Sequence, residues 1–273
     1  HRGRAVFLRP VCDGPVSLAP ESSPGTVHPV PIASSSALRS KSLAGSASAV
    51  SACGAWEGGL LVVDDLVIMC ADVGSIKSSN FGWARLVPER DQCLAKEVGA
   101  GAIRAFAEEA VHWLRSGASL ALGFECLLFV SVPDQAGDLL AGRKGEGPRP
   151  WSAGAGSAAL CCGLVETAWT LREINRRVED VIATCDWADL RARRARLFLW
   201  EAFVTGDAKK SSHAGDAEVA VDAFSSSLPD IAAASAVTAD KPFSLVVAAG
   251  RYAGMRFLES APLRSQCVVV RAS

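Results

Sequence analysis

Two acidic residues of this 273-residue chain stand directly after long apolar runs. Asp72 follows the run 66–71 and comes just before a turn at Gly74, and Glu125 follows the run 119–124. A carboxylate at the end of a buried strand costs free energy unless a cation or a metal ion compensates its charge. The alternative for Asp72 is that its carboxylate stabilises the turn that follows. The pattern favours presentation of both acids to a ligand, a metal ion or a phosphate.

Two further acids have comparable surroundings. Glu201 lies inside the apolar segment 196–204, and Asp216 stands in the first turn of a predicted helix, where an acid can also simply complement the helix dipole. Four carboxylates that converge from strand ends and a helix would form an oxygen-rich site of the kind that Mg²⁺ or Mn²⁺ prefers. Two such ions about 3.5–4 Å apart could activate a water molecule and stabilise the leaving oxygen of a phosphodiester.

A second interpretation stays open for the acids within or after strands. Glu125 and Glu201 could be core residues whose charges are neutralised by basic neighbours. The candidate neighbours are Arg143, Arg149 and His213.

A Gly- and Pro-rich loop over 133–156 carries the candidate substrate-binding residues. Long loops inside a compact domain are commonly functional. Arg143 and Arg149 could hold phosphates while Trp151 stacks on a base. The structural alternative is a solvated loop that Trp151 anchors.

The elements that must position these residues alternate between strand and helix, which predicts α/β architecture. The predicted strands are 60–63, 66–71, 81–87, 119–124 and 196–204, the predicted helices are 100–116, 157–178 and 216–235 with a break at Pro229, and short apolar segments cover 243–249 and 266–271. The stretch between Val87 and Ala100 is a poor candidate for a further strand.

Composition indicates the extent of the folded domain and the classes of partner that it can bind. Residues 1–58 are rich in Ser, Ala, Pro and Gly and predict a mostly disordered leader or non-native sequence, so that residues 59–273 form the folded domain. The chain is 49% hydrophobic and 21% charged, as expected for a substantial core. The net charge of -1 argues against a high-affinity, sequence-independent nucleic-acid binder. It does not argue against an enzyme that holds a few phosphates.

Cysteine usage and hydropathy predict the compartment. The chain has nine cysteines and no CxxC motif, which excludes a zinc ribbon and a thioredoxin-like motif and favours a reducing cytoplasm. The longest apolar run, residues 120–132, is interrupted by Glu125 and is too short to cross a bilayer, so no membrane association is expected.

The order of the motifs resembles the RNase H-like superfamily. Asp72-Val73-Gly74-Ser75 followed by Phe81-Gly82-Trp83-Ala84 looks like the first hairpin of that superfamily, and the later pieces resemble its predicted-nuclease branch, the family of domain of unknown function 429. The counterparts of those pieces are the strand and turn 123–133, Arg143 and Arg149 in the loop, Trp200-Glu201-Ala202, and His213 with Asp216-Ala217. The resemblance covers roughly residues 60–270.

This resemblance implies an RNase H-like mixed sheet flanked by helices. It also implies that Asp72, Glu125 and Asp216 are metal ligands and that Glu201 is a further acid near the site. The sequence departs from the family where Glu125 replaces the usual aspartate, which lengthens the reach to a metal by one methylene. The weak strand before Ala100 predicts a short or irregular three-strand meander.

The leading functional hypothesis is a nuclease that uses Mg²⁺ or Mn²⁺ to hydrolyse phosphodiester bonds in nucleic acid. One alternative is a nucleotide-binding protein of the actin and sugar-kinase class, because Asp72-Val73-Gly74-Ser75 also resembles the first phosphate loop of that class. The second phosphate loop and the adenosine motif of that class have no convincing counterpart. Another alternative is a non-catalytic binding module in which the acids are structural and the loop 143–156 binds a partner.

Overall fold

A computed structural model describes residues 65–74, 80–88, 94–100, 103–147, 151–258 and 263–273. All of them belong to one compact unit, residues 56–273. The predicted leader 1–58, its boundary with the folded domain and the predicted strand 60–63 lie outside the described residues.

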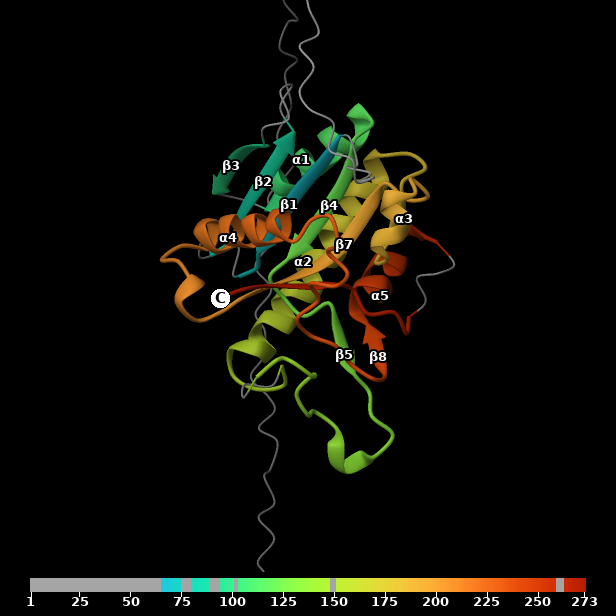
Figure 1. The fold of residues 1–273 in the computed structure, drawn as a ribbon. Coiled ribbons are helices and arrows are strands. Elements are labelled where there is room, and N and C mark those ends of the chain that lie inside the picture. The colour runs from blue at the N-terminus through green and yellow to red at the C-terminus, as the bar shows by residue number, and fades with distance from the viewer. Residues whose placement is uncertain (1–64, 75–79, 89–93, 101–102, 148–150, 259–262) are drawn as a thin grey trace, which may run out of the picture. The chain divides into compact units, whose positions relative to one another are not determined.

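The described part of the chain is built around an eight-stranded mixed sheet (Figure 1). Its strands are β1 Leu66–Asp72, β2 Gly82–Pro88, β3 Leu94–Ala100, β4 Ser119–Phe124, β6 Ile182–Thr184, β7 Leu197–Val204, β9 Arg256–Phe257 and β10 Val269–Ala272. The order across the sheet is β3-β2-β1-β4-β7-β6-β9, and β10 pairs with the second half of β7. The two pairs within β1–β2–β3 are antiparallel, and all other pairs of this sheet are parallel.

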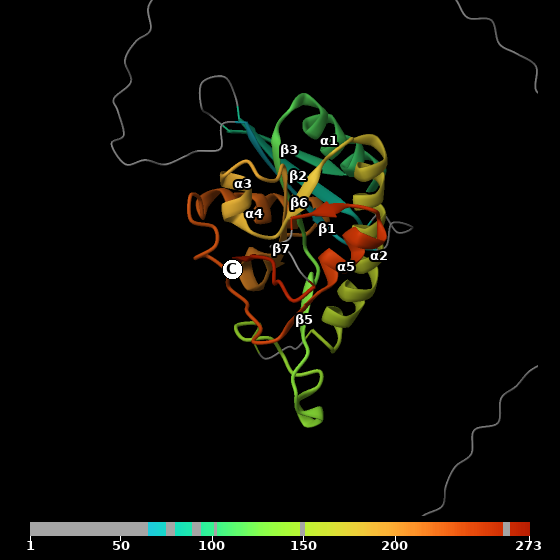
Figure 2. The ribbon, with the colours of Figure 1, turned by 90° about the vertical axis from the view of Figure 1, so that its right-hand side faces the viewer.

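Helices cover both faces of the sheet. Figure 2 shows helices on both sides of the strands. On the first side lie α1 Ile103–Ser116, α2 Ala155–Arg177 and α5 Leu245–Tyr252, and on the second lie α3 Trp187–Arg191 and α4 His213–Ser226. The predicted α/β class, a mixed sheet flanked by helices, is therefore confirmed, and the arrangement is consistent with an RNase H-like fold.

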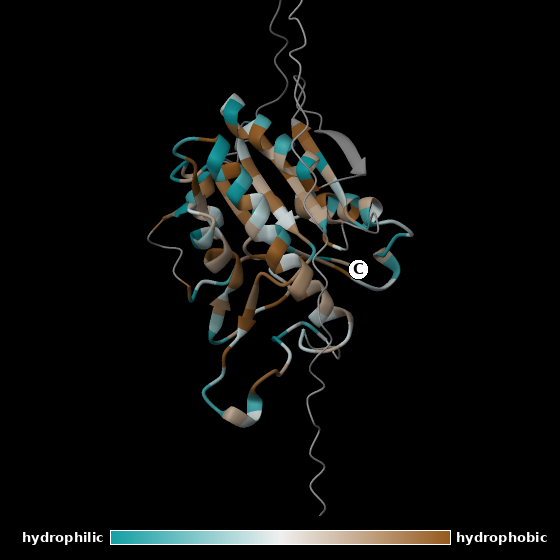
Figure 3. Ribbon diagram, turned by 180° about the vertical axis from the view of Figure 1, so that it is seen from behind, coloured by the Kyte–Doolittle hydropathy of each residue, from teal (hydrophilic) through white to brown (hydrophobic). Residues whose placement is uncertain are grey.

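Strand β1 shows why the sequence forms a two-sided sheet. All seven of its residues are buried, so it appears as a continuous apolar run rather than as an alternating pattern. Val67 and Met69 pack into the core under α1 and α2, whereas Ile68 and Cys70 pack into the core under α4. Hydrophobic residues accordingly concentrate along the central strands in Figure 3.

Several predicted elements need correction. β3 pairs with β2 in unbroken register from Leu94 to Ala100, so the three-strand meander is complete and the expected irregular strand was wrong. The predicted apolar segment 243–249 is divided between strand β8, Pro242–Ser244, and helix α5. β8 pairs with β5, Phe129–Ser131, in a separate two-stranded sheet, and a short 3₁₀ helix, η2 Ala136–Asp138, follows in the loop. Elements β6, α3 and β9 were not predicted.

Candidate metal centre

Parallel pairing of β1 and β4 brings Asp72 and Glu125 to the same sheet edge. Ala71 is the register partner of Phe124, and the backbone N–H of Glu125 donates to the carbonyl of Ala71 at 2.7 Å. The acids that follow these partners therefore emerge next to each other. Because side chains alternate along a strand, both point to the face that α4 covers.

Helix α4 supplies the third acid. Its first turn begins after Ser212, whose hydroxyl accepts a hydrogen bond from the backbone N–H of Gly215 at 3.1 Å. This turn lies across β2 at Gly82, where a Cβ atom would come within 2.1 Å of the backbone nitrogen of Ala214. Glycine at position 82 thus permits the close approach that sets Asp216 opposite Asp72. Figure 1 shows α4 crossing β1 and β2.

The three carboxylates converge. Asp72, Glu125 and Asp216 each offer an oxygen atom, and these three atoms all lie within 4.8 Å of one another. The Oε2 atom of Glu125 is buried and has no hydrogen-bond partner among the described residues. The cluster therefore contains a carboxylate oxygen that can still accept a hydrogen bond or bind a cation.

Lys209, which precedes α4, and His213, the first residue of α4, contact the three acids. Lys209 donates from Nζ to Glu125 Oε1 at 2.9 Å and to Asp216 Oδ2 at 3.0 Å. The Nδ1 atom of His213 lies 2.5 Å from Asp72 Oδ2. Sequence reasoning considered His213 as a partner of Glu125 or Glu201, and it missed Lys209. One sequence signal could have identified Lys209. It belongs to a pair of lysines, Lys209-Lys210, just before a helix whose first turn contains an acid.

Burial and mutual repulsion disfavour ionisation of the cluster. Burial raises the pKa of Asp72 to about 7, with Lys209 opposing the rise and Asp216 adding to it. Burial and the adjacent Asp72 raise the pKa of Glu125 to about 8, again against the effect of Lys209. Near neutral pH the cluster therefore holds protons that a bound divalent cation would displace.

A fourth acid, Glu166 of α2, lies near the turn that follows Asp72. Burial raises its pKa to about 7, and the backbone of Gly74 opposes the rise. Its Oε2 atom is buried without a hydrogen-bond partner in the described part of the chain. Sequence reasoning did not single out Glu166, although it shares the face of Thr170 and Ile174 at spacings of four and eight residues, which marks an acid on a buried stripe.

Glu201 does not join the cluster, contrary to the prediction. In the parallel pair of β4 and β7 it is the register partner of Phe124, so it points to the sheet face opposite Glu125. There Arg143 binds it with two hydrogen bonds, Nη2 to Oε1 at 2.7 Å and Nη1 to Oε2 at 2.9 Å. The interpretation of Glu201 as a core acid neutralised by Arg143 is the one that this geometry supports.

The same contacts argue against the predicted phosphate-binding role of Arg143. Its guanidinium is buried, also contacts Glu146, and stacks over the ring of Phe129 at 4.7 Å. Trp151 is anchored by a hydrogen bond from Nε1 to the carbonyl of Ala141 at 3.1 Å, and its stacking on a base stays a prediction. Arg149 lies outside the described residues.

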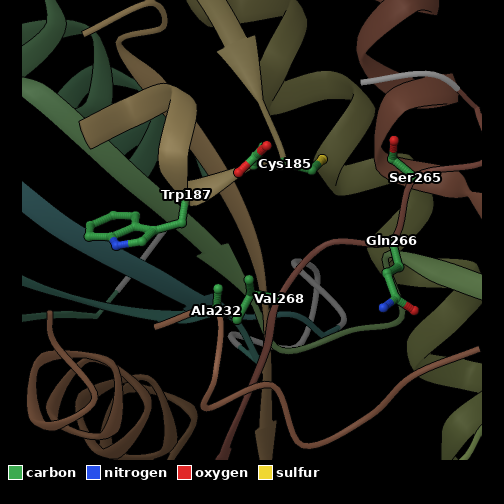
Figure 4. A pocket seen from close by; sticks show the side chains of 7 residues that line it. Cys185, Trp187, Ala232, Ser265, Gln266 and Val268 are labelled. Carbon is green, nitrogen blue, oxygen red and sulfur yellow. The ribbon is translucent and has the colours of Figure 1, made fainter. Parts of the chain in front are cut away.

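A cavity of about 290 Å³ lies apart from the acids, beyond the carboxyl end of β6. Figure 4 shows Cys185 and Trp187 on one side of it and Ser265 and Gln266 on the other. None of the clustered carboxylates lines this cavity, and the amide of Gln266 is engaged with the backbone N–H of Ala239 at 3.0 Å. The cavity therefore adds no group to the cluster of carboxylates.

Comparison of the chain with protein-family models, with curated proteins and with solved structures finds no match. The described helices include none that is both long enough and apolar enough to cross a membrane.

Proposed function

We propose that Asp72, Glu125 and Asp216 bind Mg²⁺ or Mn²⁺ and that the protein is a divalent-metal-dependent nuclease. The observation that carries this proposal is the convergence of three carboxylate oxygens, from β1, β4 and α4, within 4.8 Å of one another. The order of the sheet strands and the resemblance of the motifs to the predicted-nuclease branch of the RNase H-like superfamily support the choice of reaction.

The donor set fits a hard divalent cation. All three acids offer oxygen, and no cysteine or histidine belongs to this ligand group in the described chain. The buried Oε2 atom of Glu125 has no hydrogen-bond partner among the described residues, so it is an acceptor that a bound cation would use.

The side chains around the cluster have separable tasks. When bound, the metal supplies an activated water molecule and compensates the charge that develops on the phosphodiester. Asp72 Oδ2 contacts Nδ1 of His213, which leaves the other ring nitrogen, Nε2, to face a substrate. Because the His213 side chain is 37% exposed, it can exchange a proton with the leaving oxygen of a substrate that reaches the cluster from solvent.

A second candidate is a non-catalytic module in which the acids only stabilise the fold. One observation favours it, namely that each of the three acids contacts Lys209 or His213. In that case divalent cations would leave the melting temperature unchanged, because no native site would bind them. The actin and sugar-kinase alternative gains no support from the described residues.

Cleavage assays decide between these candidates. Purified full-length protein is incubated with labelled single-stranded, double-stranded and branched DNA and RNA, with Mg²⁺, with Mn²⁺ or with a chelator. We expect cleavage of at least one substrate only with metal, and a loss of at least about 100-fold in the Asp72→Asn variant, because loss of a metal ligand removes several kcal/mol of transition-state stabilisation. Asp240→Asn, at an exposed position, is the matched control. Metal-independent cleavage, or full activity in Asp72→Asn, would contradict the proposal.

A further inference from the structure

The ammonium group of Lys209 contacts two of the three acids that would bind the proposed metal. Nζ is 2.9 Å from Glu125 Oε1 and 3.0 Å from Asp216 Oδ2, and both carboxylates belong to the proposed ligand set. An internal cation therefore already binds to two of the three acids. Any divalent ion that uses these oxygens must share them with Lys209 or replace it.

Sharing is electrostatically unfavourable. Both cations would lie within a few ångströms of the same two oxygens, so their like charges would repel each other in a partly buried cluster. A divalent ion also brings two positive charges to three carboxylates, whereas the ammonium brings one. Hard divalent cations take carboxylate oxygens in direct contact, which leaves those acceptors poorly placed for an ammonium. Replacement is therefore the favoured arrangement.

Lys209 can leave without a change in the backbone. Its side chain is 51% exposed, and among the described residues its ammonium group contacts the two acids. It follows the short 3₁₀ helix η3, Gly206–Ala208, on the connection to α4. Asp216 is held separately, because the backbone N–H of Lys210 donates to its Oδ1 atom at 2.5 Å. Withdrawal of the lysine side chain thus leaves the acid in place.

We propose that Lys209 and a divalent cation exchange at Glu125 and Asp216. In the metal-free protein the lysine is an internal counter-ion, and it withdraws towards solvent when the metal binds. This inference rests on the proposed function, since without metal binding there is nothing to exchange. It makes Lys209 a residue that sets the metal concentration at which the centre fills.

The first test compares metal affinities by isothermal titration calorimetry with Mn²⁺ on chelator-treated, full-length protein. We expect Lys209→Gln to bind Mn²⁺ about tenfold more tightly than the unchanged protein, as when an internal competitor occupies a site nine-tenths of the time. Lys210→Gln is the matched control, because it removes the same charge from the neighbouring exposed residue. It should change the affinity much less.

The second test follows the lysine itself and needs no variant. The protein is treated briefly with an amine-acetylating reagent, with and without Mn²⁺, and modification is measured for each lysine by mass spectrometry. We expect modification of Lys209 to rise several-fold when Mn²⁺ is present, while that of Lys210 stays constant. This readout separates exchange from a general electrostatic effect of charge removal.

The outcomes separate this inference from the proposed function. If Mn²⁺ binds but Lys209 stays protected from the reagent, the exchange is wrong and the metal centre stands, even if Lys209→Gln binds more tightly. If Mn²⁺ binds neither the unchanged protein nor Lys209→Gln, both the exchange and the metal-dependent function are wrong.

Discussion

Two clusters of buried charge lie on opposite faces of the same sheet, and their hydrogen bonding differs. In the first, Arg143 meets both oxygens of Glu201, and the backbone N–H of Leu128 completes the set at 2.9 Å. In the second, one oxygen atom each of Asp72, Glu125 and Asp216 lie within 4.8 Å of one another, and one oxygen of Glu125 has no partner among the described residues. Both oxygens of Glu201 accept hydrogen bonds in the first cluster, which makes it a structural contact. In the second cluster, the Oε2 atom of Glu125 is available to a ligand.

The comparison teaches that residue type and strand position do not by themselves identify a functional acid. Glu125 directly follows β4 and Glu201 lies on the neighbouring parallel strand β7, each where the pairing between these two strands ends. What separates them is the face of the sheet to which each points and the basic group that reaches it. Both properties depend on tertiary structure.

The largest expected effect concerns the first cluster. Arg143→Met should lower the free energy of unfolding by about 3–5 kcal/mol, because it leaves Glu201 buried without a compensating charge. Urea denaturation measures this change. The control is Arg256→Met, which breaks an exposed pair with Asp180 and should cost at most about 1 kcal/mol. Equal losses of unfolding free energy in the two variants would contradict the assignment of Arg143 and Glu201 as a buried, stabilising pair.

Gly82→Ala tests how α4 reaches the second cluster. The added Cβ would meet backbone atoms of the first turn of α4, which must shift, so we expect a loss of about 2 kcal/mol in unfolding free energy. We also expect weaker Mn²⁺ binding, because Asp216 moves with that turn. Gly137→Ala, where a Cβ meets nothing within 4 Å, is the matched control. Unchanged stability and metal affinity in Gly82→Ala would contradict the close approach.

The metal affinity of the second cluster, Asp72, Glu125 and Asp216, should depend on pH. Because the pKa values of Asp72 and Glu125 are raised to about 7 and about 8, metal binding must displace protons below pH 8. The affinity should then rise with pH by up to tenfold per pH unit, or about 1.4 kcal/mol, for each proton released. Titration calorimetry in buffers of different ionisation enthalpy counts those protons. A pH-independent affinity between pH 6 and 8 would contradict this assignment.

Glu125→Gln should have a smaller effect, and it should raise the free energy of unfolding rather than lower it. A raised native pKa means that ionised Glu125 destabilises the fold, and this penalty grows as the pH rises from the unfolded value near 4.5 to about 8. Removing the charge should therefore stabilise the metal-free protein by about 1 kcal/mol at pH 8.5, as at other strained sites. At pH 4 the difference should vanish. Urea denaturation at both pH values checks the sign.

Much of the fold and of the carboxylate cluster could be predicted from local sequence. The apolar run of β1 and the helical spacing of Ile103, Phe106 and Ala110 in α1 are local signals that tertiary packing reinforced. The acids Asp72 and Glu125 were found because each directly follows an apolar run, and the parallel pairing of β1 and β4 places them at one sheet edge. β3 was underestimated because Lys96, Glu97 and Gly99 weaken its apolar pattern, whereas its backbone pairs fully with β2.

The errors in the site share one physical cause. The partner of Glu201 is 58 residues away in a loop, so no local pattern could show that Arg143 neutralises it. Alternation could have helped, since Leu197, Leu199 and Glu201 must share one face of β7. Lys209 and Glu166 were missed because their roles depend on where the segment before α4 and the middle of α2 lie in space.

The central claim, a cation held jointly by residues 72, 125 and 216, is tested most directly by diffraction. Crystals of the metal-free protein are soaked in Mn²⁺ at pH 8.5, and anomalous scattering locates the ion. We predict a peak at direct-contact distance from oxygens of Asp72, Glu125 and Asp216, with Lys209 Nζ moved away from it. A difference map without manganese at these acids, with Lys209 still bound to Glu125 and Asp216, would contradict the account.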